Sequence, residues 1–230
     1  MSGVIGIYLA AGRSSRMGCD KLRLPLGEMA LGSWALMAAV QSRLEQVIVV
    51  TGEPHAPAWI APSLFREPFR EKWRSVFCPG AREGQALSLI CGLKAAQAGH
   101  PEAVMVLLAD QPGVTVDMID GLLRCYERES VSCVVSSHRG ILQPPVLFSG
   151  VWFSDLLQLK GDEGARRLLR DPGTRTSVAC TWEDSSAFVD VDTPEQYIGY
   201  LGKNGVPIPK PVWMKLSERR QSDDSHAEIP

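Results

Sequence analysis

The segment from Leu9 to Pro25, LAAGRSSRMGCDKLRLP, combines small residues with cations in a way that suits phosphate chemistry. Its small residues would let backbone N–H groups approach a phosphate closely, and Arg13, Arg16 and Lys21 would neutralise the negative charge. The segment matches neither the GxxxxGK(S/T) phosphate loop nor the GxGxxG dinucleotide fingerprint. Taken alone it is open to two interpretations, a phosphate-binding loop or a solvated turn with scattered surface cations.

Alternating apolar runs and helical segments would place this loop at one edge of a sheet. The apolar runs typical of strands in the first part of the chain are Val4–Leu9, Gln46–Thr51, Arg74–Cys78, Ala103–Ala109 and Val131–Ser136. The segments with helical spacing between them are Leu31–Ser42, Gly84–Ala98 and Thr115–Glu127. Continuous apolar strands separated by helices predict βαβ units and a mainly parallel sheet in an α/β fold. In such sheets ligands bind beyond the carboxyl ends of the strands.

After residue 140 the pattern predicts shorter elements and then a tail. We expect a strand at Pro145–Phe148, helices at Val151–Gln158 and Asp162–Leu169, strands at Ser177–Thr181 and Ala187–Val189, and a last helix starting near Thr193-Pro194-Glu195. The Pro-rich stretch Pro54–Pro68 is expected to pack as an excursion. Residues 1–202 are predicted to form one domain, followed by a C-terminal tail at 203–230. The polar sequence predicts disorder in this tail from about residue 217.

The composition fits a globular chain of 230 residues and disfavours several classes of function. Lys and Arg number 24 and Asp and Glu 26, so the net charge of −2 gives no general attraction to nucleic acids or membranes. No apolar run approaches the roughly 20 residues that span a bilayer, and Val4–Ala11 lacks the features of a signal peptide. The six cysteines lack CxxC spacing and the four histidines are scattered, which favours free thiols in a reducing cytoplasm and disfavours a zinc site.

Five ordered segments resemble one known family. The loop LAAGRSSRMGCDKLRLPLG closely resembles the signature loop of the MobA-like nucleotidyltransferases. Within that family it is most similar to the molybdenum cofactor cytidylyltransferases and their relatives in xanthine dehydrogenase maturation. The later segments that agree are EGQALSLICGL at 83–93, VLLADQPGV at 106–114, LKGDEGARRLL at 159–169 and DVDTPEQY at 190–197. The match spans residues 4–201, and its ordered motifs favour phosphate binding over a solvated turn for the first loop.

The resemblance implies a fold and a reaction. The fold would be the Rossmann-like three-layer nucleotidyltransferase fold, GT-A-like and of the nucleotide-diphospho-sugar transferase type, with a mainly parallel mixed sheet. Such enzymes transfer a nucleoside monophosphate from a nucleoside triphosphate to a phosphorylated acceptor and release pyrophosphate. In this subgroup the acceptor is the phosphate of molybdopterin, the nucleotide is usually CTP, and a client would be a molybdenum hydroxylase of the xanthine dehydrogenase type. Because the substrate phosphate is the nucleophile, no Ser, Cys or His triad is expected.

The resemblance also assigns roles to residues that match the motifs. It implies nucleotide contacts from Leu9, Ala10, Ala11, Gly12, Arg13, Gly84 and Ser88, and catalytic roles for Arg16, Lys21 and Asp110. Asp110 matches the family's Mg2+ ligand, and Asp192 is preferred to Asp190 as the second carboxylate because the Asp-Thr-Pro-Glu arrangement matches there. The alternative for Asp110 and Asp192 is support of the helix that follows. Arg13 could equally be solvated, and Ser88 could be a plain helix residue.

On the acceptor side the resemblance is less complete. It implies acceptor contacts from Gln111, Gly161, Asp162 and Arg166. Gln111 could instead contact the base, and the run Gly161–Arg166 could be an ordinary capped helix. Gln143-Pro144-Pro145 stands where relatives often carry a Gly-His-Pro type run, and Ala86-Leu87 stands where smaller or polar residues are common. These departures leave the expected fold unchanged.

Two other functions compete with this interpretation. One is a different small-molecule nucleotidyltransferase, acting on a sugar phosphate or an isoprenoid precursor, but the Gly161–Arg166 segment is typical of the molybdopterin group. The other is a non-catalytic carrier of molybdopterin, but a carrier need not keep Lys21, Asp110 and Asp192 together. For the nucleotide we expect CTP over GTP, because guanylyl-transferring relatives tend to carry a second glycine where this chain has Ala11.

Overall fold

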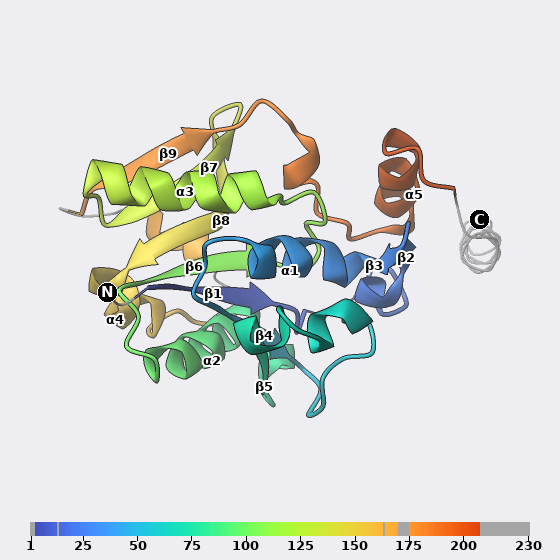
Figure 1. Cartoon of the computed structure of the whole chain (residues 1–230), viewed down its shortest axis with the longest axis horizontal. Helices are drawn as coiled ribbons and strands as arrows, with labels where there is room; N and C mark the ends of the chain where they lie inside the picture. Colours follow the sequence, from blue (N-terminus) through green and yellow to red (C-terminus); the bar gives the residue numbers. More distant parts are fainter. Residues whose placement is uncertain (1–2, 13, 163, 170–174, 208–230) are drawn as a thin grey trace, which may run out of the picture.

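The fold is built on a seven-stranded sheet with helices on both faces (Figure 1). The computed structural model describes residues 3–12, 14–162, 164–169 and 175–207. The strands of this sheet are β1 (Val4–Leu9), β4 (Gln46–Thr51), β5 (Trp73–Phe77), β6 (Ala103–Leu108), β7 (Cys133–His138), β8 (Ile141–Ser149) and β9 (Ser177–Thr181). Their order is β5-β4-β1-β6-β8-β7-β9. Strands β5, β4, β1 and β6 are parallel, β8 is antiparallel to both its neighbours, and β9 is parallel to β7.

Helices make the sheet the middle of three layers. They are α1 (Leu31–Gln41), α2 (Gln85–Gln97), α3 (Val116–Glu129), α4 (Phe153–Leu156) and α5 (Pro194–Lys203). One buried apolar cluster joins α1 and α3 to one face of the sheet, and a second joins α2 and α4 to the other face. The predicted Rossmann-like architecture with a mainly parallel mixed sheet is therefore confirmed. Among the described residues, no helix is both long enough and apolar enough to cross a lipid bilayer.

Close packing holds α2 against the parallel strands. Ile7 of β1 and Val50 of β4 are fully buried, as expected for central strands covered on both faces. A Cβ atom at Gly92 would lie 2.5 Å from Ile7 Cγ2 and 2.8 Å from Val50 Cγ2, so the helix needs glycine here to approach so closely. Leu89 and Leu93 are buried on either side of this contact. As a result, the N-terminus of α2 lies near the carboxyl end of β1.

The early elements follow the predicted bounds more closely than the later ones. The bounds of β1, β4 and β9 are those predicted, and Thr115 caps α3 by accepting a hydrogen bond from Met118 N. The strand predicted at Ala187–Val189 is wrong, because a 3-10 helix occupies Ser186–Phe188. Its apolar pattern reflects packing rather than sheet pairing: a Cβ at Gly113 would lie 2.3 Å from the Ser186 carbonyl oxygen, which shows that the two backbones are in contact.

Other late elements differ in length and type from the predictions. Strand β8 covers nine residues where a strand over Pro145–Phe148 was expected. The predicted helix Val151–Gln158 is a 3-10 turn, Gly150–Trp152, followed by the four-residue α4. The predicted helix Asp162–Leu169 is a 3-10 helix that starts only at Ala165. Most of the predicted tail, from residue 208, lies outside the described residues.

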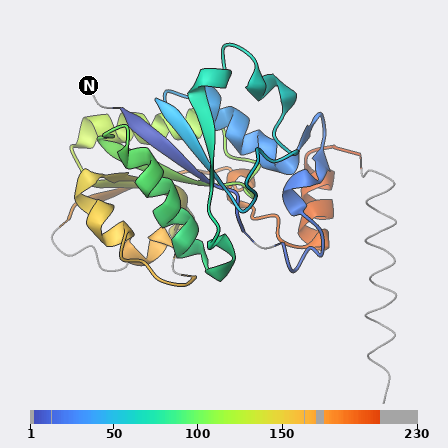
Figure 2. The ribbon, with the colours of Figure 1, turned by 90° about the horizontal axis from the view of Figure 1, so that it is seen from below.

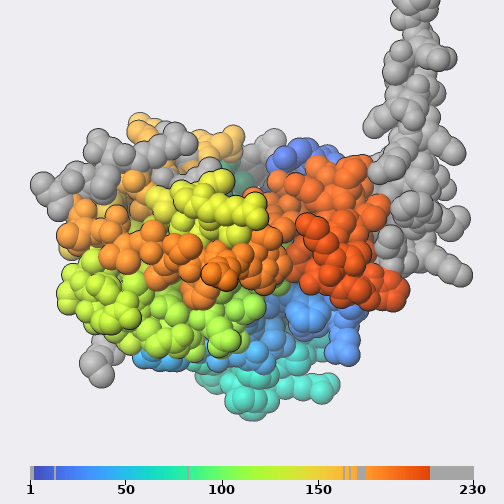
Figure 3. Space-filling model, turned by 90° about the horizontal axis from the view of Figure 1, so that it is seen from above, coloured from blue at the N-terminus to red at the C-terminus, as the bar shows by residue number. Residues whose placement is uncertain are grey.

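The C-terminal helix packs beside the N-terminal loop, although the two are far apart in the sequence. Figures 1 and 2 both show α5 next to the short hairpin formed by β2 (Pro25–Leu26) and β3 (Met29–Ala30). The buried Tyr197 of α5 donates a hydrogen bond to the carbonyl oxygen of Pro25. In the space-filling view of Figure 3, the segment from β9 to α5 forms an orange-to-red band alongside α3. This arrangement brings the residues that precede α5 to the loop after β1.

Candidate functional site

The loop after β1 is folded so that Lys21 points inward. Its first peptide is held by a hydrogen bond of 3.0 Å from Ala10 N to the Val50 carbonyl oxygen. Lys21 N donates to Ser14 Oγ at 3.2 Å, and a 3-10 helix then covers Lys21–Arg23. The carboxylate of Asp20 caps this helix by accepting a hydrogen bond from Leu22 N. The loop therefore positions the lysine through local backbone contacts.

Lys21 joins two aspartates that are distant in the sequence. Its Nζ atom donates to Asp110 Oδ2 at 2.7 Å and to Asp192 Oδ1 at 2.6 Å. The Lys21 side chain is only 7% exposed, and both carboxylates are 23% exposed. The other oxygen of Asp192 accepts a hydrogen bond of 2.7 Å from Arg16, whose side chain is 70% exposed. Two cations and two carboxylates thus form one cluster, which we call the charged cluster.

The carboxylates of the two aspartates are free to join the charged cluster, because other residues cap the neighbouring helices. Asp110 follows β6, and its carbonyl oxygen accepts a hydrogen bond of 3.0 Å from Val191 N. Thr193 caps α5 in a reciprocal capping box with Gln196, whose Oε1 also accepts from Asp192 N at 2.9 Å. The helix after Asp110 is capped by its own threonine. Helix support is therefore not what the Asp110 and Asp192 carboxylates do.

The electrostatics of the cluster keep Lys21 charged. Burial lowers the pKa of Lys21, but the carboxylates of Asp110 and Asp192 outweigh this effect, so its pKa lies above the ordinary lysine value. The neighbouring Asp190 behaves differently from these two. Loss of hydration and the charge of Asp110 raise the pKa of Asp190, while its hydrogen bond of 2.9 Å from Gln111 Nε2 opposes that rise. Asp190 is therefore paired with an amide and not with a cation.

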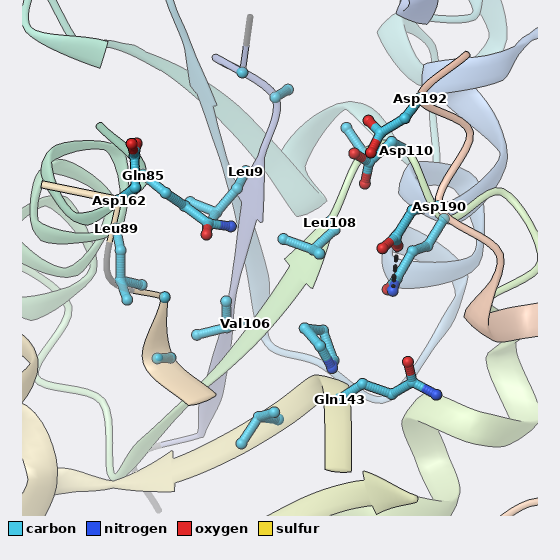
Figure 4. A pocket seen from close by; sticks show the side chains of 18 of the residues that line it. Leu9, Gln85, Leu89, Val106, Leu108, Asp110, Gln143, Asp162, Asp190 and Asp192 are labelled. Carbon is cyan, nitrogen blue, oxygen red and sulfur yellow. Dashed lines mark hydrogen bonds between the residues drawn. The ribbon is translucent and has the colours of Figure 1, made fainter. Parts of the chain in front are cut away.

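A cavity of about 590 Å³ opens beside the charged cluster, and we call it the site cavity (Figure 4). Its walls come from β1, β6 and β8, from the start of α2, from the segment before and within the 3-10 helix Ala165–Leu169, and from the segment before α5. The predicted site residues that line it are Leu9, Ala10, Gly12, Arg16, Lys21, Asp110, Gln111, Asp162, Asp190 and Asp192. Figure 4 shows the carboxylates of Asp110, Asp190 and Asp192 grouped at one side and Gln85 and Asp162 at the other.

A second cavity, of about 640 Å³, adjoins the first across the loop, and we call it the loop cavity. It shares Ala10, Gly12 and Leu22 with the site cavity. Its remaining walls include Ala11, residues 51–53 at the end of β4, and the buried Trp59 from the predicted excursion. The loop after β1 therefore separates the two cavities and lines both of them.

Several predicted site residues line neither cavity, and others lie outside the residues that the structure describes. Ser88 is buried inside α2 and lines neither cavity. Gly84 has φ = 147°, and a Cβ there would lie 2.2 Å from the Gly161 carbonyl oxygen, so these two glycines pack on each other. Arg13 lies outside the described residues, and of Arg166 only the backbone, within the 3-10 helix Ala165–Leu169, is described.

Other residues line the site cavity without having been predicted to do so. Arg167 lies on its wall, next to the predicted Arg166. The sequence carried no signal that favours Arg167 over Arg166 as the residue facing the cavity. The segment is a 3-10 helix and not the α-helix that the spacing suggested. Val106 and Val146 also line the cavity. Both belong to apolar strand runs that sequence patterns interpret as core.

The charged cluster is suited to a hard divalent cation. Its two carboxylates already bind one cationic group, the Lys21 ammonium, through one oxygen of each. No group of three or more His, Cys, Asp or Glu suitable for a metal occurs within the described ranges. A pair of carboxylates that leaves other positions to substrate phosphates is the mode in which Mg2+ is commonly bound. Asp110 and Asp192 therefore fit such an ion in the presence of a phosphorylated ligand.

This fold and site define a class of nucleotide-handling enzyme. A mainly parallel sheet carries a small-residue loop after its first strand, with cations and paired carboxylates at the carboxyl edge. The family model of the MobA-like NTP transferase domain matches residues 6–178, and the chain belongs to this family. The resemblance stated from the sequence is therefore confirmed, as is the class, nucleotidyltransferase.

Known relatives extend over most of the chain. The purine catabolism protein PucB of Bacillus subtilis is 40% identical over 195 residues, which are 84% of this chain and 94% of the relative. A probable molybdenum cofactor guanylyltransferase of Mycobacterium ulcerans is 35% identical over 123 residues, 52% of this chain and 54% of the relative. The structure of Rv0371C of Mycobacterium tuberculosis in complex with manganese has a TM-score of 0.64 at 21% identity, and the match covers 87% of this chain and 99% of that one.

Proposed function

We propose that this protein transfers a nucleoside monophosphate, CMP from CTP in preference, to the phosphate of a molybdopterin-type acceptor and releases pyrophosphate. The observation that carries the proposal is the charged cluster, in which Lys21 bridges Asp110 and Asp192 under a small-residue loop. Membership of the MobA-like family supports nucleotidyl transfer. The relative named as a probable molybdenum cofactor guanylyltransferase supports the acceptor.

The nucleotide would bind along the loop after β1. The backbone of Leu9, Ala10, Ala11 and Gly12 would contact it, with Arg13 as a further nucleotide residue implied by the motifs. Gly84 and Ser88, which the motifs also imply, line neither cavity and would support the start of α2 instead. The exposed Gly12 has no atom within 4 Å of the position of a Cβ, so its peptide is open to a ligand. The loop cavity beside Ala11 and Trp59 would hold the base and ribose, because it is the space next to the loop that lies away from the acidic residues after β6.

The phosphates would bind at the cationic end of the cluster. The substrate phosphate of the acceptor attacks the α-phosphorus in line, and pyrophosphate leaves with the electron pair of the broken P–O bond. Lys21 and Arg16 supply positive charge to the crowded phosphates as charge develops in the transition state. Lys21 donates to both carboxylates in the free protein, and the third N–H of its ammonium remains for a phosphate.

Asp110 and Asp192 would hold a divalent ion, for which we propose Mg2+. When bound, the ion neutralises phosphate charge and orients the triphosphate. The manganese complex of the structurally similar mycobacterial protein supports a divalent metal. Asp192 is preferred to Asp190 because it shares the Lys21 ammonium with Asp110, whereas Asp190 accepts a hydrogen bond from Gln111.

The acceptor would occupy the part of the site cavity that faces β8 and the segment before residue 165. Gln111, Gly161, Asp162 and Arg166 are the residues proposed to contact it. The packing of Gly84 on Gly161 connects this segment to the start of α2, where Ala86 N donates to the Gly161 carbonyl oxygen at 3.0 Å. The segment proposed to contact the acceptor is therefore in direct contact with the start of α2. The product would be delivered to a molybdenum hydroxylase of the xanthine dehydrogenase type.

The test is pyrophosphate release measured with each of the four nucleoside triphosphates, with and without molybdopterin. We expect release that needs both Mg2+ and molybdopterin and is fastest with CTP. Release that instead depends on a sugar phosphate or an isoprenoid phosphate would assign another acceptor. Tight molybdopterin binding without pyrophosphate release from any nucleotide would identify a carrier and overturn the proposal.

A further inference from the structure

The buried amide of Gln111 has one end paired and the other end unpaired. The residue is 1% exposed, directly follows Asp110 and lines the site cavity. Its Nε2 donates to Asp190 Oδ1 at 2.9 Å, but its Oε1 is buried and has no hydrogen-bond partner among the described residues. Ser136 Oγ and Trp182 Nε1 are also buried and unpaired, but neither of these residues lines the site cavity. Within the described ranges, Gln111 alone combines the two properties.

The orientation of this amide is fixed, so the unpaired atom is the oxygen. Turning the amide by 180° would place Oε1 against the Asp190 carboxylate, and two hydrogen-bond acceptors would then face each other. The backbone of Gln111 is held as well, because its N–H donates to the Leu108 carbonyl oxygen and its own carbonyl oxygen accepts from Val114 N. Rotation therefore offers Oε1 no better partner within the protein. A buried acceptor without a partner is costly to fold, which is a reason to expect that a ligand completes it.

The position of the amide indicates which substrate it meets. In the sheet, β6 lies between β1 and β8. The loop after β1 is the proposed nucleotide loop, β6 leads to Asp110 and Gln111, and β8 carries Gln143. Figure 4 shows Asp190 between Asp110 and Gln143. Asp190 is the residue that accepts the hydrogen bond from Gln111 Nε2. Gln111 therefore lies beyond the charged cluster on the side away from the loop. A nucleotide held along the loop would have its triphosphate between its base and this amide.

The chemistry of a carbonyl oxygen restricts the group that it can bind. Oε1 is an acceptor, so an organic ligand must offer it an N–H or O–H donor, which excludes ionised phosphate oxygens and ring carbonyls. On the proposed function, the phosphate of the acceptor is at the charged cluster, so the donor belongs to another part of that molecule. We infer that Gln111 Oε1 accepts a hydrogen bond from a ring N–H or amino group of a pterin-type heterocycle, and that Gln111 selects the acceptor. Asp190 is then a positioning residue that holds the amide in this orientation.

The experiment compares Gln111→Met with the wild-type enzyme. Methionine has a similar shape but neither accepts nor donates a strong hydrogen bond. We expect the KM for molybdopterin to rise by about 5- to 150-fold, which corresponds to leaving one donor unpaired, while the KM for CTP changes less than twofold. The matched control is Ser136→Ala, which removes another buried unpaired oxygen outside the cavity and should change neither constant.

A binding assay separates this inference from the proposed function. Fluorescence titration with pterin-6-carboxylate measures ring recognition without any turnover, even if no nucleotide supports pyrophosphate release. The wild-type protein should bind this probe at least fivefold more tightly than Gln111→Met. It should lose that advantage for the same ring with methyl groups on its donor nitrogens. This second comparison varies the ligand and does not depend on how well the variant folds.

Three outcomes would overturn the inference. The first is a rise in the KM for CTP with an unchanged KM for molybdopterin, which would assign Gln111 to the nucleotide. The second is equal binding of the pterin probe by the wild-type protein and Gln111→Met, including the absence of binding by both. The third is an equal loss of affinity in Gln111→Met for the plain and the methylated ring, which would show a structural effect only.

Discussion

The two sides of the site cavity differ in how their polar groups are paired. On the charged side, Arg16, Lys21, Asp110 and Asp192 are paired with one another, and every bond in the cluster is between opposite charges. On the amide side, Gln111 is paired only through its nitrogen, and its oxygen is buried without a partner among the described residues. Each residue of the charged side thus has an oppositely charged partner within the protein, whereas the amide side keeps one buried atom without a partner.

This difference implies two kinds of binding. On the charged side, a metal ion competes with the Lys21 ammonium for the carboxylates and a phosphate competes with the carboxylates for the cations, so binding there depends on charge and on salt. On the amide side, the ligand meets a group that is already oriented and has no internal hydrogen bond to give up. Changes on the charged side should therefore alter rate and metal affinity, whereas changes on the amide side should alter the choice of acceptor.

The largest expected effect on the charged side is the loss of turnover in Lys21→Ala. Turnover should fall by about 10²–10³-fold, because one positioned cation no longer stabilises the transition state. Mn2+ binding should become tighter, because the ammonium that bridges Asp110 and Asp192 is absent and the two carboxylates are free for the ion. Pyrophosphate release measures the first effect, and titration followed by electron paramagnetic resonance measures the second.

The control for this variant is Lys94→Ala, which removes an exposed lysine of α2 that lines neither cavity. It should change neither turnover nor Mn2+ affinity. Thermal unfolding checks that both variants are folded. Normal turnover of Lys21→Ala, or Mn2+ binding weaker than in the wild-type protein, would show that Lys21 does not compete with a cation for the carboxylates.

Asp110→Asn should be nearly as damaging, because the variant loses the negative charge that would hold the metal ion. Turnover should fall by about 10²-fold at a fixed Mg2+ concentration, which is the cost of one positioned charge in a site of this kind. Asp192→Asn should follow Asp110→Asn, and Asp190→Asn should be less affected because Asp190 pairs with an amide. Activity measured across a Mg2+ series distinguishes the three variants.

Asp117→Asn is the matched control, since this exposed aspartate lies in the first turn of α3. Near-normal activity of Asp110→Asn at every Mg2+ concentration would refute its metal role. If Asp190→Asn were more damaged than Asp192→Asn, the second carboxylate would have been assigned to the wrong residue.

Sequence patterns predicted the charged side of the molecule better than its later segments. The runs that became β1 and β4 are continuous and apolar because both faces of these strands are covered, and such runs leave little doubt about their bounds. The carboxyl ends of parallel strands meet at one edge, which is why the Lys21 loop after β1 and Asp110 after β6 lie together. By contrast, Ala187 is buried against a loop, and its apolar pattern was wrongly interpreted as a strand.

Other features of the site depend on tertiary contacts that no local pattern records. The ion pairs of Lys21 depend on a 3-10 turn and on α5, whose residues are more than 170 positions away. Ser88 matched a motif but is buried inside α2, because the close approach at Gly92 fixes which face of that helix meets the sheet. The unpaired oxygen of Gln111 likewise becomes visible only when the position of Asp190 is known.

Nucleotide choice tests the loop that separates the two cavities. Ala11 lines the loop cavity, and Ala11→Gly removes the methyl group that this residue contributes beside the space proposed for the base. The wild-type enzyme should favour CTP over GTP by about 10- to 200-fold in kcat/KM, the range that one methyl-sized contact supports, and the variant should narrow this ratio. The measurement is kcat/KM for CTP, GTP and ATP with one acceptor. A wild-type preference for GTP, or an unchanged ranking in Ala11→Gly, would show that this loop is not the selector.

The smallest effect is expected from Arg16→Ala, which tests how far the charged cluster extends toward solvent. Arg16 bonds to Asp192 at 2.7 Å but is 70% exposed, so the free energy of unfolding should change by less than about 1 kcal/mol. The KM for CTP should nevertheless rise several-fold, and the difference from the wild-type enzyme should shrink as salt is added, because exposed charges are screened.

Arg43→Ala is the matched control: this arginine forms an exposed ion pair of 2.6 Å with Glu127 near the amino ends of the parallel strands. It should show a similar small change in stability and no change in the KM for CTP. If the two variants behaved alike in both measurements, Arg16 would form only a surface ion pair with Asp192. Lys21 would then be the outermost residue of the cluster that binds phosphate.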